Sequence, residues 1–178
     1  MYEQFKTRAE GVSAEVYRFG NRTEALEFIT GFLRQEGVAD VPQGYALWAD
    51  CPFLEGGDRS ALGGIAGLKF TVSRDLAAQA RFGISQLDRA LADTGSLVQD
   101  ATAVEQRLVS TLPDIHIAIV PTGGLLPDMP ALLTRLRPEE SNYIAMITGP
   151  SRTADIERVL TIGVHGPERL VIVFVDEL

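Results

Sequence analysis

Residues 115–120 read IHIAIV, residues 143–147 read YIAMI, and residues 170–175 read LVIVFV. Apolar runs of this length are typical of parallel strands that are buried on both faces of a sheet. The segments between them, near 128–136 and 153–161, have the apolar spacing of helices. Two consecutive strand–helix–strand units follow from this order. They predict an α/β fold, a three-layer α/β/α sandwich around a mostly parallel open sheet.

The first part of the chain adds further elements to this sheet. Asn21 followed by Glu24 is close to a capping box, so a helix is expected over 21–36, ending at Gly37. The glycine-rich segment 55–67 predicts a loop, either a plain connection or a mobile lid. The remaining expected elements are strands at 12–19, 45–48 and 68–72, a helix at 73–80, and a hairpin formed by 89–92 and 96–98.

The composition is that of one globular domain spanning residues 1–178. Hydrophobic residues make up 46% of the chain and charged residues 22%. The net charge is −8 and the isoelectric point is near 4.8, with the basic residues scattered. Because nucleic-acid binding depends on clustered Lys and Arg, a nucleic-acid partner is not expected.

Cys51 is the single cysteine of the chain. A disulfide within the chain, a cysteine-rich zinc site and a cysteine-ligated iron–sulfur cluster are therefore excluded. We expect no metal and no cofactor on this chain, and Cys51 to be a part-buried thiol rather than a nucleophile. The sequence shows no basic-then-apolar leader and no apolar stretch long enough for a membrane span, which predicts a cytoplasmic protein.

In open parallel sheets, ligands bind beyond the carboxyl ends of the strands. Two turns are expected at that edge, at 121–124 and 149–153. The second turn is the better candidate for an anion site, because Gly149 allows close backbone approach and Arg152 offers a planar fork for a carboxylate or phosphate. Ser151 and Thr153 would add hydroxyls beside the N-terminus of the following helix. The alternative is that Ser151 or Thr153 merely caps that helix.

Other candidates complete this predicted site. The first turn would contribute Thr122, Gly123 and Gly124. The hairpin turn would contribute Thr94, Gly95 and Ser96, with Asp93 as the candidate catalytic carboxylate. His165 is expected either to touch a ligand or a subunit interface or to satisfy backbone groups in its loop. His116, alone at the start of a core strand, is expected to be structural.

The run Thr148-Gly149-Pro150-Ser151-Arg152-Thr153-Ala154-Asp155-Ile156-Glu157, followed by Gly163-Val164-His165-Gly166-Pro167, resembles the signature of the LUD-domain family, the family of the lactate utilization protein C. Segments 93–98 and 112–117 also resemble family segments in the same order. The resemblance covers residues 82–176. It implies a fold similar to the sugar-phosphate isomerase and CoA-transferase group, and work beside two cysteine-rich iron–sulfur proteins in oxidising L-lactate to pyruvate.

Two functions follow as hypotheses. The first is a non-redox subunit or accessory factor of lactate oxidation, which binds a small carboxylate or phosphate and relies on iron–sulfur clusters carried by partner proteins. The second is a free-standing enzyme that acts on an acyl-CoA, a sugar phosphate or another small anion, with Asp93 as nucleophile or base. Whether this chain is itself an enzyme stays open at the level of sequence.

Overall fold

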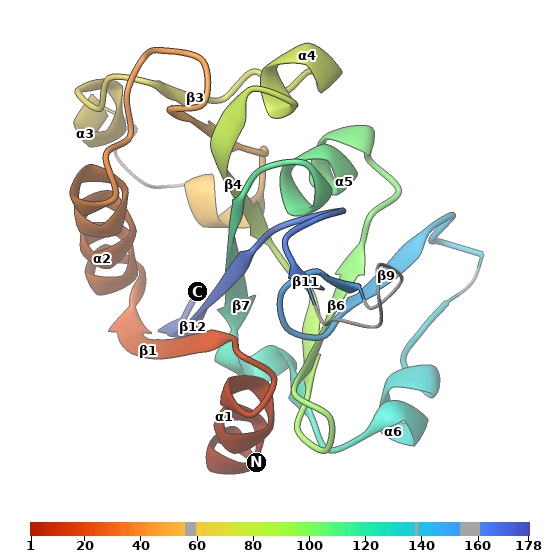
Figure 1. The fold of residues 1–178 in the computed structure, drawn as a ribbon. Coiled ribbons are helices and arrows are strands. Elements are labelled where there is room, and N and C mark those ends of the chain that lie inside the picture. The colour runs from red at the N-terminus through yellow and green to blue at the C-terminus, as the bar shows by residue number, and fades with distance from the viewer. Residues whose placement is uncertain (56–59, 138, 154–160) are drawn as a thin grey trace.

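The computed structural model describes residues 1–55, 60–137, 139–153 and 161–178. Its centre is a six-stranded sheet in the order β1-β12-β7-β4-β2-β3, in which every neighbouring pair is parallel (Figure 1). The strands are β1 (Glu15–Asn21), β2 (Tyr45–Trp48), β3 (Leu68–Lys69), β4 (Ala80–Gln86), β7 (Ile115–Pro121) and β12 (Arg169–Glu177). The predicted α/β class, with a mostly parallel central sheet, is confirmed.

One face of this sheet is covered by α2 (Arg22–Gln35), with η1 (Pro52–Leu54) and α3 (Ser60–Gly63) beyond it. The predicted helix start is confirmed, because the Asn21 side chain accepts a hydrogen bond of 3.0 Å from the Glu24 amide. The Glu24 carboxylate in turn accepts from the Gly20 amide. Ala25, Ile29 and Leu33 recur at helical spacing and are fully buried against the sheet. Within the described residues, no helix has the length and apolarity needed to cross a membrane.

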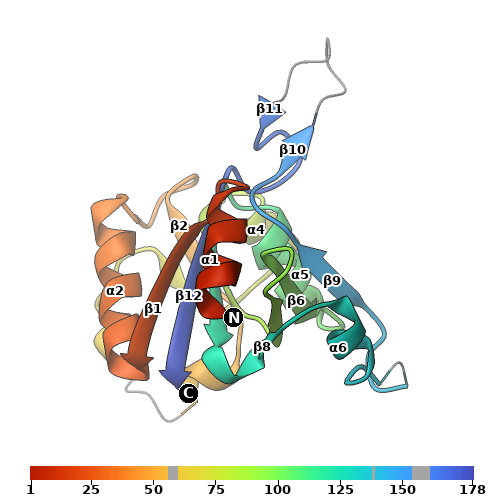
Figure 2. The ribbon, with the colours of Figure 1, turned by 90° about the horizontal axis from the view of Figure 1, so that it is seen from below.

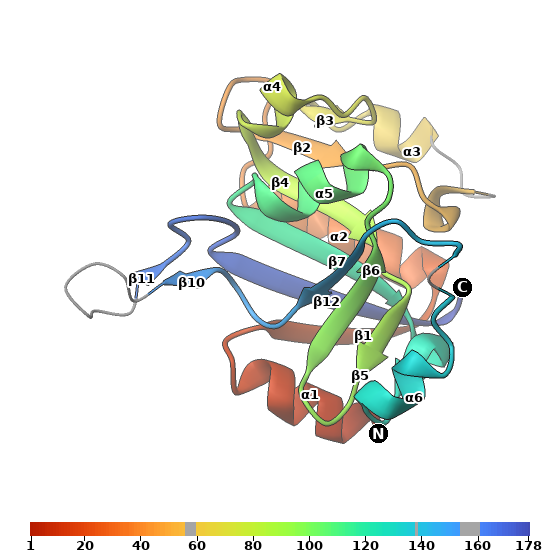
Figure 3. The same cartoon turned by 90° about the vertical axis from the view of Figure 1, so that its right-hand side faces the viewer.

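The opposite face is covered by helices and by a second sheet (Figure 3). The helices are α1 (Tyr2–Glu10), α4 (Arg74–Ala77) and α5 (Val104–Thr111). The second sheet has the order β8-β5-β6-β9, and α6 (Met129–Leu133) lies beside it. Its strands are β5 (Arg89–Leu91), β6 (Ser96–Asp100), β8 (Leu125–Leu126) and β9 (Ile144–Ile147). The antiparallel pair β5–β6 is the predicted hairpin.

The expected position of the 143–147 strand is wrong. β9 pairs antiparallel with β6 in the second sheet, so it is not a member of the parallel sheet. Met146 is 47% exposed, which shows that this apolar run lies on an edge strand rather than in a twice-covered centre. The preceding residues are held by side chains near β6, because the Ser141 hydroxyl donates to Asp100 and the Asn142 amide donates to Thr102. The two consecutive strand–helix–strand units are therefore not formed.

The expected helix at 153–161 also differs from the structure. Thr153 lies in β10 (Arg152–Thr153) and Thr161 in β11 (Thr161–Ile162), and these two short strands pair antiparallel. Residues 154–160 lie outside the described part of the chain. The two strands stand away from the body of the molecule (Figure 2). The loop expected at 55–67 is interrupted by α3, and its residues 56–59 are likewise outside the described ranges.

Two elements without a sequence prediction, β4 and α5, bring polar residues into the core. They pack unusually closely, because a Cβ built on Gly83 of β4 would lie 1.8 Å from the Val109 carbonyl oxygen of α5. Only glycine permits this approach. The short distance brings the last turn of α5, with Ser110 and Thr111, down onto the amino edge of the sheet.

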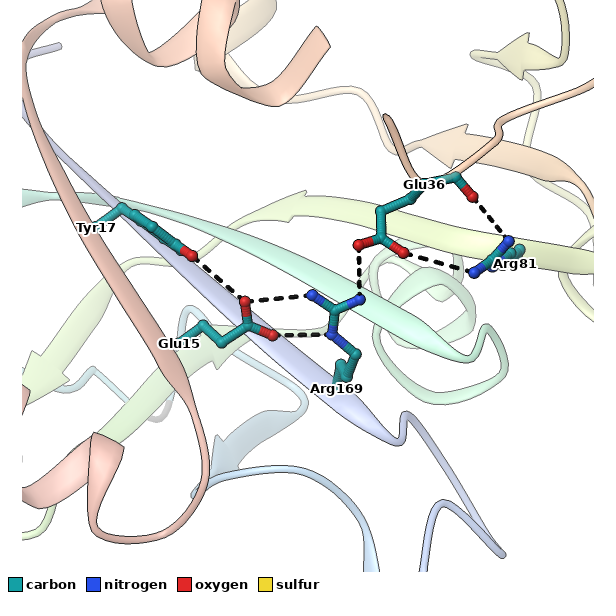
Figure 4. Close-up of polar contacts among 5 residues, drawn as sticks. All are labelled: Glu15, Tyr17, Glu36, Arg81 and Arg169. Carbon is teal, nitrogen blue, oxygen red and sulfur yellow. Dashed lines mark hydrogen bonds and ion pairs between the residues drawn. The ribbon is translucent and has the colours of Figure 1, made fainter. Parts of the chain in front are cut away.

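An ion-pair network fastens the amino ends of three strands to α2 (Figure 4). Arg169 makes two hydrogen bonds to the Glu15 carboxylate, at 2.8 and 3.2 Å, and lies 3.0 Å from the Glu36 carboxylate. Arg81 bonds the Glu36 carbonyl at 2.7 Å and pairs with its carboxylate at 3.5 Å. Because both carboxylates are shared with arginines, this cluster is a structural clasp rather than a set of free charges.

Candidate functional site

A cavity of about 240 Å³ opens at the amino edge of the parallel sheet, between the last turn of α5 and the segment that follows β9. It lies at the starts of β7 and β12, where His116 and Leu170 are paired in register. Its lining consists of residues 146–151 and 165–167, with Ser110, Thr111, His116 and Leu170. The expected site turn is thus part of a real cavity, at the edge opposite to the one that was predicted.

The wall from Gly149 to Ser151 is fixed by its backbone. Gly149 has a φ of +67°, and a Cβ there would lie 2.5 Å from the Val12 carbonyl oxygen, so a side chain is excluded on both counts. The Ser151 amide donates to the Pro167 carbonyl at 2.8 Å, and the Ser151 carbonyl accepts from the Gly163 amide at 2.9 Å. These bonds join the turn and the 163–167 loop, which carries the exposed His165, into one wall.

Arg152 lies beside this wall but does not line the cavity. Its guanidinium donates to the Val12 carbonyl and lies against Gly149, where a Cβ would come within 2.7 Å of Nη2. One fixed positive charge therefore stands next to the rim. The residue that follows, Thr153, is in β10, so the helix N-terminus that was expected to attract an anion is not formed at this position.

Ser96 supports the cavity from behind. Its hydroxyl lies 2.7 Å from the hydroxyl of Thr148, a lining residue, and Ser96 itself is only 7% exposed. The remainder of the hairpin turn points elsewhere: Asp93 and Thr94 are exposed, and Gly95 packs on α1, where a Cβ would lie 2.5 Å from the Ala9 amide nitrogen. Ser96 is the part of that turn which reaches the site.

Thr122, Gly123 and Gly124 form η2 (Thr122–Gly124) at the carboxyl end of β7. His116 stands at the start of the same strand, about 20 Å away at the usual strand rise. The prediction that this turn and the Gly149–Thr153 turn share one edge is therefore wrong. The prediction failed because β9 is not a strand of the parallel sheet. It pairs antiparallel with β6 in the second sheet, and the turn that follows it lies at the amino edge.

His116 contributes a buried imidazole to the cavity wall. It is 1% exposed, and its Nε2 lies 2.9 Å from the Ser85 hydroxyl of β4. Burial lowers the pKa of His116 from 6.5 to about 4, so the ring is neutral at pH 7. Among the described residues its Nδ1 has no hydrogen-bond partner. The cavity wall therefore contains a neutral imidazole with one buried nitrogen that has no partner among the described residues.

The electrostatic character of the cavity follows from its lining. No Asp, Glu, Lys or Arg side chain is among the lining residues that the structure describes, and the polar groups are hydroxyls and the imidazoles of His116 and His165. The Ser110 and Thr111 hydroxyls donate to carbonyls of their own helix, so their oxygens remain as acceptors. With Arg152 beside the rim, the site suits a small polar molecule that carries at most one negative charge.

A second cavity, of about 270 Å³, lies between α6 and the second sheet. It is lined by charged residues of both signs, among them Arg137, Glu140 and Asp100. These charges already have protein partners: Arg137 pairs with Glu140 at 3.3 Å, and Asp100 accepts from Ser141 and Thr102. We favour the amino-edge cavity despite its slightly smaller size, because it is lined by His116, whose Nδ1 has no partner among the described residues, and by the motif segments.

The sequence analysis did not place His116 in a cavity wall, and it did not single out the polar residues near it, Ser85 and Gln99. All three are buried, and His116 stands in a strand that is otherwise apolar. A polar side chain in the middle of a buried strand is the available signal, since such a group requires a partner. Cys51 behaves as expected: it is 6% exposed, and burial raises the pKa of its thiol.

The comparisons with known proteins agree with this architecture. The LUD domain family model matches residues 2–175, and the chain belongs to the LUD-domain family. The chain is 42% identical over 112 residues to lactate utilization protein C of Exiguobacterium sp., covering 60% of this chain and 49% of that protein. It is 36% identical over 107 residues to lactate utilization protein C of Bacillus subtilis, covering 57% and 45%. The chain thus spans about half the length of the curated relatives it matches.

A solved structure shows the same fold over nearly the whole chain. A DUF162 family protein from Deinococcus radiodurans superimposes with a TM-score of 0.64 at 22% sequence identity, covering 98% of this chain and 95% of that one. At this level of identity the likeness establishes the fold alone.

Proposed function

We propose that this chain is a non-redox subunit or accessory factor in the oxidation of L-lactate to pyruvate, and that it binds a small carboxylate in the amino-edge cavity. The names of its curated relatives support the lactate role. One structural observation supports the site: residues 148–151 and 165–167, which carry the family signature, meet around His116 to enclose the cavity.

The dimensions and charges of the cavity favour a small monoanion. A volume of about 240 Å³ is below the roughly 300–1,000 Å³ of pockets for drug-sized ligands, and suits a molecule of a few heavy atoms. Arg152 places one positive charge beside Gly149, and no carboxylate lines the described cavity wall to repel an anion. Lactate and pyruvate each carry one carboxylate and one further oxygen, for which the imidazoles of His116 and His165 are the candidate donors in the wall.

The oxidation itself releases two electrons and two protons from L-lactate, and these electrons require an acceptor. A single cysteine cannot hold a four-cysteine iron–sulfur cluster, and no nicotinamide or flavin fingerprint is recognised in the sequence. We therefore place the electron acceptor on cysteine-rich iron–sulfur partner proteins. This chain would bind the carboxylate, or its product, beside them.

No specific observation favours the alternative of a free-standing enzyme acting on an acyl-CoA or a sugar phosphate. That reaction needs a carboxylate at the site, and its candidate, Asp93, is an exposed residue that does not line the cavity.

The test is reconstitution with native partners. The tagged chain is captured from a lysate of lactate-grown cells, and co-purifying proteins are identified by mass spectrometry and by iron content. Lactate-dependent dye reduction is then measured with and without the chain. We expect iron–sulfur proteins to co-purify with the chain, and we expect dye reduction to require the chain. Arg152→Gln should slow the dye reduction.

The matched control is Arg137→Gln, which removes a 69% exposed arginine that does not line the cavity and should leave dye reduction unchanged. Dye reduction that proceeds equally well without the chain would refute the proposed role.

A further inference from the structure

Behind the cavity, a continuous chain of polar side chains runs from the half-buried Gln106 of α5 through Gln99 of β6 and Ser85 of β4 to His116, and its last three members are buried. The Gln106 amide nitrogen donates to the Asp50 carbonyl at 3.0 Å, and the Gln99 amide nitrogen lies 3.1 Å from Gln106 Oε1. The same Gln99 nitrogen lies 3.1 Å from the Ser85 hydroxyl, which lies 2.9 Å from His116 Nε2. Ser85 and Gln99 have no exposed surface.

We call Gln106, Gln99 and Ser85 the relay. The donor and the acceptor of each hydrogen bond in it follow from the Asp50 carbonyl, to which Gln106 is bonded. A backbone carbonyl such as that of Asp50 only accepts, so the amide nitrogen of Gln106 must face it and Gln106 Oε1 must face Gln99. The Gln99 amide then donates to both Gln106 and Ser85. The reversed amide would set the two glutamine oxygens against each other, and their repulsion excludes it.

The proton positions on Ser85 and His116 follow in turn. A serine hydroxyl that accepts from Gln99 has its own proton left to donate, and His116 Nε2 is its partner at 2.9 Å. In a neutral imidazole whose Nε2 accepts, the proton sits on Nδ1. This nitrogen is buried and has no partner among the described residues, while the His116 ring lines the cavity.

We propose that the Gln106–Gln99–Ser85 relay locks His116 in the Nδ1-protonated tautomer, so that the cavity wall presents a fixed donor to a carboxylate or carbonyl oxygen of a small ligand. His116 is then a specificity-determining residue, which selects ligands that offer an acceptor oxygen at this depth. A site built to donate rejects analogues that lack the acceptor, because the buried donor would stay unpaired. The ligand class rests on the proposed function, whereas the tautomer does not.

The tautomer is tested first, without ligand, by long-range ¹H–¹⁵N correlation spectra of the histidine rings. The chain has two histidines, so a His165→Gln variant assigns the signals of His116. We expect a protonated Nδ1 and an unprotonated Nε2. In Gln99→Glu the new carboxylate accepts from Ser85, and the tautomer should reverse. Should that variant not fold, Ser85→Ala removes the link and should leave a mixture of the two forms. A protonated Nε2 in the wild type would overturn the proposal.

The donor role is tested by adding sodium L-lactate, sodium pyruvate or uncharged lactamide, with sodium chloride as the ionic-strength control. We expect the Nδ1 proton signal of His116 to shift with each oxygen acceptor. His116→Asn keeps an amide donor near the Nδ1 position and should bind within a few fold of wild type. His116→Gln places its amide near Nε2, keeps the Ser85 contact, and should bind about tenfold or more weakly.

The outcomes separate the two proposals. A His116 signal that none of these compounds moves, or equal binding by the Asn and Gln variants, would overturn the donor role. Carboxylate binding at His116 together with lactate oxidation that does not need the chain would leave this inference standing and refute the proposed function alone.

Discussion

Ser96 and Thr148 share a hydrogen bond of 2.7 Å between their hydroxyl groups, across 52 residues of sequence. Ser96 begins β6 and Thr148 follows β9, so the bond closes the end of this antiparallel pair at the point where the chain leaves for the cavity wall. The position of Gly149 therefore depends on the second sheet as well as on its own turn.

Removing the Thr148 hydroxyl should leave the buried Ser96 hydroxyl unpaired, whereas Thr148 is exposed and its hydroxyl can bind water when Ser96 is replaced. Thr148→Val should lower the free energy of unfolding by about 1–2 kcal/mol, and Ser96→Ala should lower it by less. The double variant should cost less than the sum of the two, since neither hydroxyl is then stranded. Urea unfolding of the four proteins measures this coupling. Strictly additive losses would show that the bond contributes nothing to stability.

Burial of His116 predicts a pH-dependent stability. The pKa of His116 is lowered to about 4 in the folded chain, against about 6.5 when unfolded, so below pH 6.5 the unfolded chain takes up a proton that the native state does not. The free energy of unfolding should fall by up to about 3 kcal/mol between pH 6.5 and pH 4 from this group, and no further below.

The comparison for this pH effect is with His116→Gln, which lacks the titrating ring. Subtracting its pH profile removes the contribution of the carboxylates. His165→Gln changes an exposed ring and should keep the wild-type profile. If wild type and His116→Gln lose stability in parallel over this range, the buried neutral state of His116 is wrong.

Two glycines give opposite predictions for the same substitution. Gly149→Ala introduces a side chain at a φ of +67° and close to the Val12 carbonyl, and should cost roughly 1–3 kcal/mol as well as weakening carboxylate binding. Gly31→Ala lies within α2 with nothing within 4 Å of the new Cβ, and should stabilise by about 0.5–1 kcal/mol. Thermal unfolding of both variants checks the signs. A neutral Gly149→Ala would mean that the turn relaxes freely.

The ion pairs of Arg169 should contribute more to the free energy of unfolding than an exposed ion pair does. Arg169→Gln leaves the carboxylates of Glu15 and Glu36 with one cation fewer at a partly buried edge, and should lower the free energy of unfolding by about 2 kcal/mol. Arg137→Gln breaks a pair whose side chains are 69% and 63% exposed, and should change it by less than about 0.5 kcal/mol. Adding Glu36→Gln to Arg169→Gln should restore part of the loss. Equal effects of the two arginine changes would contradict a structural role for the clasp.

The sequence could predict those elements whose signals are local. The α2 helix has its cap, its periodic apolar face and its capping carboxylate within one segment, and β7 and β12 are covered on both faces as their composition indicates. β4 gave no such signal, because Gly83, Ser85 and Gln86 interrupt its apolar run. Two of these residues are needed at the site, because Gly83 leaves room for α5 and Ser85 is the partner of His116.

The location of the site could not be predicted for a related reason. An apolar run such as β9 has the same composition on an edge of a second sheet as in the centre of the first, and the choice between the two depends on pairing with β6, more than 40 residues earlier. That choice reverses the direction of the strand and moves Gly149 and Ser151 to the opposite edge. The sequence could therefore predict which residues form the turn, but not which residues surround it in the fold.

The place of β12 in the sheet has a consequence for how the chain acquires its structure during synthesis. The last strand in sequence lies between β1 and β7, both of which are made much earlier, so until residues 169–177 have left the ribosome these two strands have no common neighbour. From the synthesis of β1 until that of β12, the nascent chain must keep two apolar strand edges apart, a state that is prone to aggregation. We expect residues 169–177 to complete the parallel sheet in a late folding step, and the cavity wall at 165–167 to form in the same step.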